Sequence, residues 1–162
     1  YWHFKDKADL FNAMMERVTL PLEQTLTAAY AEQATHPVVE IRSAMQDALR
    51  LIATDAQTRR VLQIATHQVE YTADMGAVLE RHLSVHDGCV ERNLVALQRA
   101  FAARNQTPPI ALDFAARGLQ VLVEGLVHQW LLNPEAFDLQ ANGLAALDVY
   151  LGGLGLHDTA PG

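Results

Sequence analysis

The feature of this sequence that most constrains its fold is the helical spacing of its apolar residues, which persists over nearly the whole chain. Apolar side chains that recur three or four positions apart share one face of an α-helix. Alanine (25 residues) and leucine (23 residues) favour helices, whereas the β-branched and aromatic residues that favour strands are sparse. We therefore predict a single all-α domain and exclude all-β, collagen-like and disordered classes.

This spacing and its interruptions divide the chain into about six helices. The first begins at Asp6 or Lys7 and contains Pro21, where we expect a kink. His36 and Pro37 separate it from the second helix. The apolar row of the first helix consists of Leu10, Met14, Val18, Leu22, Leu26 and Tyr30. The later helices are expected at about 38–52, 55–71, 73–104, 110–132 and 139–152, followed by a frayed tail at 157–162.

The start of the third helix carries its own signal. Thr54-Asp55-Ala56-Gln57 has the pattern of a capping box, in which a threonine caps the helix and a glutamine three residues later reaches back to it. We therefore expect the third helix to begin directly after Thr54.

The segment 110–132 is apolar nearly all round, which indicates a helix that is buried on more than one side. Gly118 and Gly125, seven residues apart, would let another helix approach closely. We expect the last two helices to pair with those of a second copy. An apolar helix surface that stays exposed to solvent favours aggregation, and such pairing would cover it. The polar Gln120 and Glu124 point either to solvent, the more frequent case, or into an internal cavity where a carboxylate needs a partner.

Charge and cysteine content restrict the partners and the compartment. Twelve Lys and Arg against 19 Asp and Glu give a net charge of −7, which opposes phosphate binding by the chain as a whole. The single cysteine, Cys89, excludes an internal disulfide and fits a reducing cytoplasm. No run of about 18 uncharged apolar residues is present, so we expect a cytoplasmic protein with no membrane partner.

Several side chains are candidates for chemistry. His82 and His86 have the four-residue spacing of two-histidine metal sites, but no HExxH motif accompanies them, and histidines lining a groove are the better interpretation. His67 and Glu70 supply only part of what a di-iron bundle needs. Cys89 sits in mid-helix, where no free N–H can form an oxyanion hole, so a packing role is favoured. A metal-dependent helical-bundle enzyme is therefore only the alternative, and we expect no cofactor.

The first eleven residues, Tyr1 to Phe11, resemble a specific signature, which is the end of the recognition helix and the start of the next helix in TetR-family transcriptional repressors. Arg59-Arg60 with residues 67–71 resembles the central helix of the drug-efflux-pump repressor branch, the AcrR-like group. The segment 125–139 resembles the dimerisation region of that branch. The resemblance implies a TetR-like C-terminal bundle of about six helices that dimerises through a four-helix bundle.

The same resemblance divides the chain. Residues 1–7 would be the remnant of a helix-turn-helix DNA-binding domain, residues 8–156 the ligand-binding and dimerisation domain, and residues 157–162 a tail. Because most of the helix-turn-helix is absent from this sequence, we expect a further segment upstream of Tyr1.

Roles of single residues are also implied by the resemblance. Tyr1, His3 and Lys7 would contact DNA phosphates, which positions a protein on the duplex without reading bases. The ligand cavity would be lined by Met15, Leu62, Gln63, Thr66, Gln120, Val123 and Glu124. The dimerisation residues would be Gly118, Gly125, Trp130, Leu147 and Tyr150.

The implied function is that of a ligand-responsive repressor of a multidrug efflux operon, not of an enzyme. A drug-like amphipathic inducer would bind better to a state in which two helix-turn-helix domains are spaced wrongly for successive major grooves, so that operator DNA is released. The expected partners are operator DNA, the inducer and a second copy of the chain.

Overall fold

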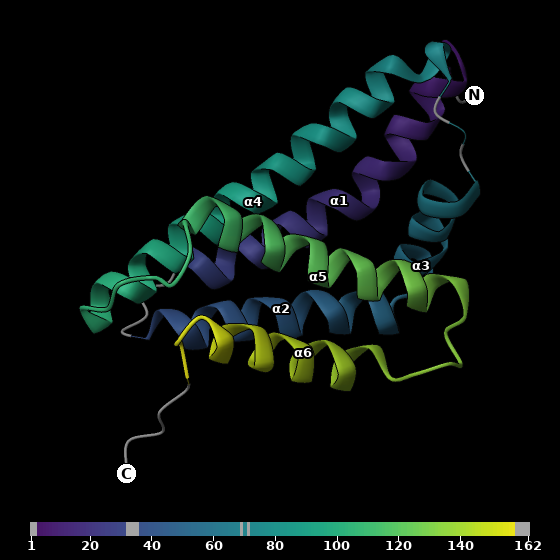
Figure 1. Cartoon of the computed structure of the whole chain (residues 1–162). Coiled ribbons are helices and arrows are strands. Elements are labelled where there is room, and N and C mark those ends of the chain that lie inside the picture. The colour runs from purple at the N-terminus through teal and green to yellow at the C-terminus, as the bar shows by residue number, and fades with distance from the viewer. Residues whose placement is uncertain (1–2, 32–35, 69, 71, 158–162) are drawn as a thin grey trace.

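The computed structural model describes residues 3–31, 36–68, 70 and 72–157, and this part of the chain is helical without any strand (Figure 1). Between the third and fourth α-helices lie a π-helical turn, η1 (Ile64–Gln68), and a 3₁₀ turn, η2 (Ala73–Met75). The α-helices are α1 (Lys7–Ala31), α2 (Pro37–Thr54), α3 (Ala56–Gln63), α4 (Gly76–Arg104), α5 (Leu112–Leu132) and α6 (Leu139–Gly153). The predicted all-α class with six helices is confirmed.

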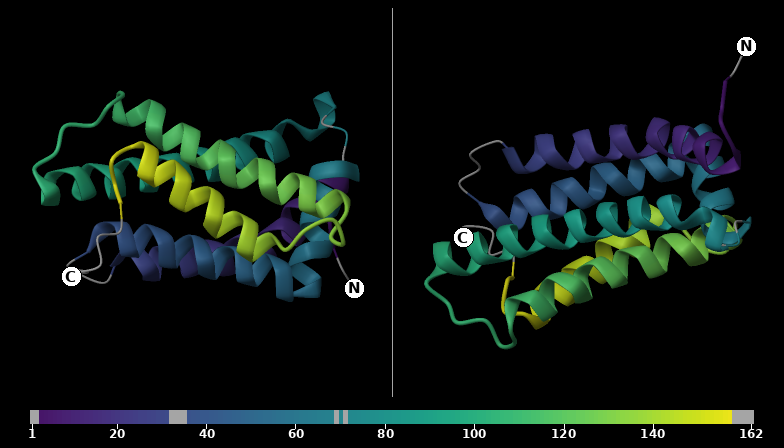
Figure 2. Two further views of the ribbon diagram at one scale, coloured as in Figure 1. Left: turned by 60° about the horizontal axis from the view of Figure 1, so that its bottom comes forward. Right: turned by 90° about the horizontal axis from the view of Figure 1, so that it is seen from above.

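Helix α2 lies in the middle of the bundle, where it packs against α1, α4 and α6. Helix α5 completes the bundle by packing on α4 and α6. Figure 2 shows α1 on one side of α2 and the pair of α5 and α6 on the other. The N-terminal part of α4 extends beyond α5 and runs alongside α1 (Figure 1), so only its C-terminal part belongs to the four-helix core.

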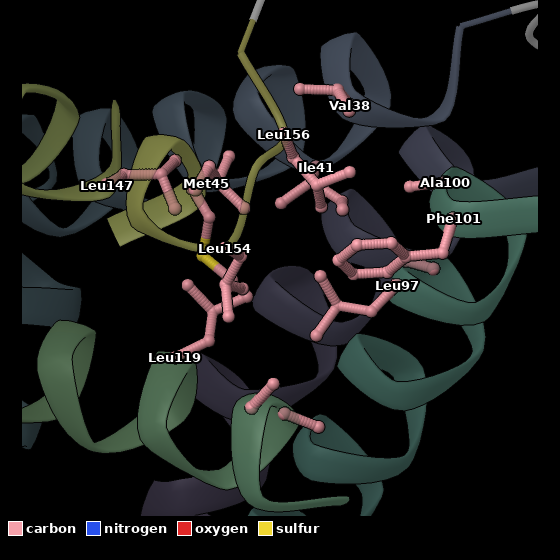
Figure 3. Close-up of a cluster of buried hydrophobic side chains, with 14 residues drawn as sticks. Val38, Ile41, Met45, Leu97, Ala100, Phe101, Leu119, Leu147, Leu154 and Leu156 are labelled. Carbon is pink, nitrogen blue, oxygen red and sulfur yellow. The ribbon is translucent and has the colours of Figure 1, made fainter. Parts of the chain in front are cut away.

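The main core cluster joins α2, α4, α5 and α6 (Figure 3). Ile41, Leu97, Leu119 and Leu147 meet there, and none of them is more than 1% exposed. Two smaller clusters are named here after their largest members. The Trp130 cluster contains Leu49, Ile52, Val127, Trp130, Leu131 and Leu139, and the Phe11 cluster contains Phe11, Ala65, Met75 and Val78.

The capping-box prediction at the start of α3 is wrong by one residue. Thr54 belongs to the end of α2, where its hydroxyl donates to the carbonyl of Arg50 at 2.7 Å. Asp55 caps α3 instead, and its carboxylate accepts from the N–H of Thr58 at 2.9 Å. Hydrogen bonds from the Thr58 side chain and backbone lower the pKa of Asp55. Because the Thr54 hydroxyl is already used within α2, the next residue becomes the cap.

The predicted third helix does not continue to residue 71. Helix α3 ends at Gln63, and the wider turn η1 follows directly. A π-turn places one more residue in each turn than an α-helix, so it rotates the side chains that follow. Here the rotation packs Ala65 into the Phe11 cluster, while Leu62 packs against the Trp130 cluster on α5.

The apolar row predicted for α1 is wrong at its start. Leu10 is 42% exposed, whereas its neighbour Phe11 and the later Val18 and Thr19 are buried. A strict four-residue row winds slowly around a helix of 3.6 residues per turn, so it cannot stay on one face over 25 residues.

Within the described part of the chain, no helix combines the length and apolar character that crossing a membrane requires.

Helix α6 begins at a capping residue whose loss we expect to destabilise the fold. The carboxylate of Asp138 accepts from the N–H of Ala141 at 2.8 Å. Replacing Asp138 with alanine removes this bond and should lower the free energy of unfolding by about 1 kcal/mol. Urea denaturation measures the loss. Glu135→Ala, which changes an exposed carboxylate just before the cap, is the matched control, and an equal effect of both changes would contradict the capping role.

Candidate functional site

A row of polar side chains lies between α4 and α5. Gln120 and Glu124 are one turn apart on α5, and His86 and Asn93 are seven residues apart on α4, so each pair shares one helix face. Asn93, only 2% exposed, donates from Nδ2 to Gln120 Oε1 at 3.4 Å. Gln120 donates from Nε2 to Glu124 Oε1 at 3.0 Å, and His86 Nδ1 lies 2.8 Å from the same oxygen. We call these four residues the polar row.

The two carboxylate oxygens of Glu124 are used unequally. Oε1 meets both Gln120 and His86, while Oε2 accepts no hydrogen bond from any described residue. The side chain of Glu124 is 37% exposed, so the carboxylate has room for another donor. Of the two orientations that the sequence left open, the structure thus turns Gln120 and Glu124 toward α4, with Glu124 at the open end of the row.

Polar contacts also fasten α3 and η1 to the end of α5. Gln63 donates from Nε2 to the carbonyl of Leu131 at 3.0 Å, and His67 Nε2 lies 3.1 Å from the carbonyl of His128. The rings of His67 and His128 meet edge to face, with 5.9 Å between their centroids. Burial is the main cause that lowers the pKa of His128; Glu124 opposes the shift, and His67 and His82 add to it.

Cys89 lies next to the polar row on α4. Burial raises the pKa of its thiol, and the neighbouring Arg92, which donates from Nη2 to Sγ at 3.2 Å, only partly offsets this. A thiol that keeps its proton is a poor nucleophile. The environment of Cys89 therefore agrees with the packing role that the sequence favoured.

The apolar residues predicted for the ligand cavity fall into two groups. Leu62 and Val123 both pack against the Trp130 cluster. Met15 packs against the Phe11 cluster and lines a cavity of about 30 Å³ between α1 and α4. Thr66 is half-buried on η1, directly after Ala65 of the Phe11 cluster. The apolar members of the predicted set thus belong to two different clusters and do not form one contiguous wall.

The sequence interpretation did not include His86 and Asn93 among the ligand-binding residues. Their seven-residue spacing, which puts both on one face of α4, was the available signal. The spacing does not predict that this face contacts Gln120 and Glu124 on α5, because that contact depends on how α4 and α5 pack together.

The residues expected to contact DNA lie at the N-terminal end of the bundle. Tyr1 is outside the described residues. His3 and Lys7 are exposed, and Lys7 is the first residue of α1. His3, Phe4 and Leu10 line part of an open groove of about 710 Å³ beside α1 and α3.

The residues expected at a dimer interface have different surroundings. Trp130 and Leu147 are 5% and 1% exposed, because they belong to the core of the single chain. Gly118 lies against Tyr150, whose hydroxyl donates to a carbonyl of α5 at 2.8 Å. Gly125 is exposed, with no atom within 4 Å of the position that a Cβ would occupy. The close approach at Gly118 is therefore made by α6 of the same chain.

Another set of apolar residues on the last two helices is uncovered. Phe114, Val121 and Leu132 on α5 are 68%, 57% and 67% exposed, and Val149 on α6 is 77% exposed. Phe114 and Val121 are seven residues apart, as are Gly125 and Leu132, so all four α5 residues lie along one stripe. We call these five residues the open face.

A metal centre finds no support in the side-chain arrangement. In the ranges that the structure describes, no three His, Cys, Asp or Glu side chains are grouped so that they could hold a metal ion. His86 is engaged with Glu124, and His82 is exposed one turn away on α4.

The described part of the chain is thus a six-helix bundle with a half-buried polar row and an uncovered apolar face. The chain belongs to the TetR-type family described as MAATS-type transcriptional repressor, C-terminal region, which matches residues 36–155. Members of this family and the relatives below are transcriptional regulators and not enzymes.

Individual relatives agree with this assignment. The HTH-type transcriptional regulator TtgR of Pseudomonas putida is 30% identical over 140 residues, which cover 86% of this chain and 66% of TtgR. The chain thus spans slightly less than two thirds of that relative.

Two solved structures share the fold. The structure of NalD, the secondary repressor of the MexAB-OprM multidrug efflux pump in Pseudomonas aeruginosa, matches with a TM-score of 0.81 at 28% identity, over 95% of this chain and 76% of NalD. The complex of SmeT with triclosan matches with a TM-score of 0.78 at 28% identity, over the whole of this chain and 79% of SmeT. SmeT is the repressor of the Stenotrophomonas maltophilia efflux pump SmeDEF.

Proposed function

We propose that residues 8–156 form the ligand-binding and dimerisation portion of a repressor of a multidrug efflux operon, and that residues 1–7 connect it to a helix-turn-helix. An amphipathic, drug-like compound would bind beside the polar row and cause release of operator DNA. The observation that carries the proposal is Glu124, a partly exposed carboxylate whose Oε1 is engaged by Gln120 and His86, while Oε2 accepts no hydrogen bond from any residue that the structure describes.

The composition of the site supports loose recognition of amphipathic molecules. Leu62 and Val123 offer apolar surface, which contributes about 25 cal/mol for each Å² buried by a ligand. The polar row offers a few groups that orient the ligand. Apolar walls with few polar anchors discriminate weakly between compounds of similar size, as a regulator of a multidrug pump requires.

Coupling to DNA would run through η1 and α1. Thr66 on η1 would border the bound ligand, and the adjacent Ala65 lies in one cluster with Phe11 of α1. A ligand that displaces η1 would therefore shift the end of α1 that carries His3 and Lys7. For release, the ligand must prefer the state that does not bind DNA, with a coupling of typically 1–3 kcal/mol.

DNA binding would involve Tyr1, His3 and Lys7 as phosphate contacts. The exposure of His3 and Lys7 at the end of α1 supports this role. Such contacts increase the affinity for DNA without selecting a base sequence. The net charge of −7 is consistent with a helical bundle that does not contact DNA beyond these N-terminal residues.

Dimerisation would cover the open face. Paired across a twofold axis, α5 and α6 of two copies form a four-helix bundle, in which Gly125 permits close approach and Phe114, Val121, Leu132 and Val149 become buried. Trp130 and Leu147 would contribute to this interface indirectly, because they pack α5 and α6 against the core of the same chain.

The ligand site is tested by filling it. We expect Thr66→Trp to weaken the binding of triclosan, the compound present in the SmeT complex, by at least about tenfold in isothermal titration calorimetry, because the indole occupies the space beside η1. Thr107→Trp, in the exposed loop between α4 and α5, is the matched control and should bind normally. Unchanged affinity in a folded Thr66→Trp protein would move the site elsewhere in the bundle.

A further inference from the structure

We propose that His86 is a specificity-determining residue of this site, and that its imidazole proton decides whether Glu124 accepts a cationic or an uncharged ligand group. The inference rests on the proposed function, because it concerns the ligand class of the same site.

The geometry of the pair is the starting point. His86 is the single described imidazole that contacts the Glu124 carboxylate, at 2.8 Å from Oε1. Its side chain is 21% exposed, so the contact is partly shielded from water, while Glu124 Oε2 accepts no hydrogen bond from any residue that the structure describes. A ligand that uses Oε2 therefore binds to a carboxylate whose other oxygen already faces His86.

Charge then separates two ligand classes. When His86 is protonated, the imidazolium and the carboxylate form a neutral pair, and a ligand cation at Oε2 would lie one carboxylate width from a like charge. When His86 is neutral, the carboxylate keeps its full charge and attracts a cation. An uncharged hydroxyl group donates to Oε2 in either state, because it brings no net charge.

The sign of the linkage follows. Binding of a cation disfavours the imidazole proton, so it releases that proton, and affinity for the cation rises with pH. Affinity for an uncharged hydroxyl compound stays nearly constant. Histidine is in general the side chain that proteins use for charge changes near neutral pH, so a pH series is the direct test of this selectivity.

Other charged and titratable groups surround the pair and require controls. On α4 they are His82, Cys89 and Arg92; on α5, His128; on η1, His67; and on α1, Glu23. His82 and His67 act on His128, and Arg92 and Glu23 act on Cys89. None of these side chains forms a hydrogen bond with Glu124 in the described structure, so they act on the carboxylate only over a distance.

Two probes of similar size separate the classes. N-methylquinolinium is a permanent cation and 2-naphthalenemethanol is an uncharged alcohol, and neither titrates between pH 5.5 and pH 8. For the unaltered chain, we expect the affinity for N-methylquinolinium to rise several-fold over this range in isothermal titration calorimetry, and that for 2-naphthalenemethanol to change by less than about twofold.

Variants assign the effect to His86. His86→Gln keeps a hydrogen-bond donor beside Glu124 but cannot titrate, so the pH dependence of cation binding should disappear. His82→Gln and His128→Gln, which alter neighbouring imidazoles, should retain it. Glu124→Gln should weaken binding of N-methylquinolinium and leave that of 2-naphthalenemethanol within a few-fold.

The outcomes distinguish this inference from the proposed function. Binding of both probes with an unchanged pH dependence in His86→Gln would overturn the role of His86 and leave the ligand site standing. Failure of both probes, and of triclosan, to bind the unaltered chain would instead remove the ligand site, and the role of His86 with it.

Discussion

A single glutamate on the open face is expected to convert the proposed dimer into a monomer. Val121 is 57% exposed at the middle of the α5 stripe. In a twofold interface each replacement appears twice, so Val121→Glu would bury two carboxylates without partners. A buried, unpaired charge costs roughly 3–5 kcal/mol, which corresponds to a loss of more than about 100-fold in dimer affinity.

Analytical ultracentrifugation at micromolar concentration measures this change. Val95→Glu is the matched control, because Val95 is also an exposed valine, at 45%, but lies on α4 outside the open face. The unaltered chain and Val95→Glu should sediment as dimers and Val121→Glu as a monomer. A dimer that persists in Val121→Glu would show that the open face is not the interface.

The second large effect concerns the stability of the single chain. Leu147→Ala removes a side chain that is 1% exposed in the main core cluster, between α2, α4 and α5. Replacement of a buried leucine by alanine lowers the free energy of unfolding by about 2–5 kcal/mol, because it leaves a cavity as well as losing apolar burial.

The measurement is made in the Val121→Glu background, so that association does not contribute. Val149→Ala, two residues further along α6 and 77% exposed, should change monomer stability by less than about 0.5 kcal/mol. Similar losses in the two variants would contradict the burial of Leu147 within one chain.

The helices were largely predictable from the sequence because they depend on local spacing. The main cluster contains Ile41, Leu97 and Leu119, but the segment 110–132 is apolar nearly all round and did not show which of its faces would enter this cluster. The errors fall where local rules compete. Thr54 satisfies its hydroxyl within α2, and the helix widens into η1 after α3, which no periodicity within 55–71 indicates.

The candidate site was less predictable because its contacts cross between helices. Gln120 and Glu124 were visible as polar residues in an apolar segment, but their partners His86 and Asn93 could be identified only after α4 and α5 were packed. The exposure of Val121 and Val149 against the burial of Leu147 likewise depends on how far each helix is rotated about its axis, which composition does not determine.

The widened turn η1 also bears on how chains of this kind can vary in length. A π-turn holds one residue more than the α-turn that could replace it, so a related chain could lose a residue between α3 and η2 by closing this turn. The helices before and after it would keep their buried faces. A one-residue deletion in this turn would therefore leave the register of the core intact.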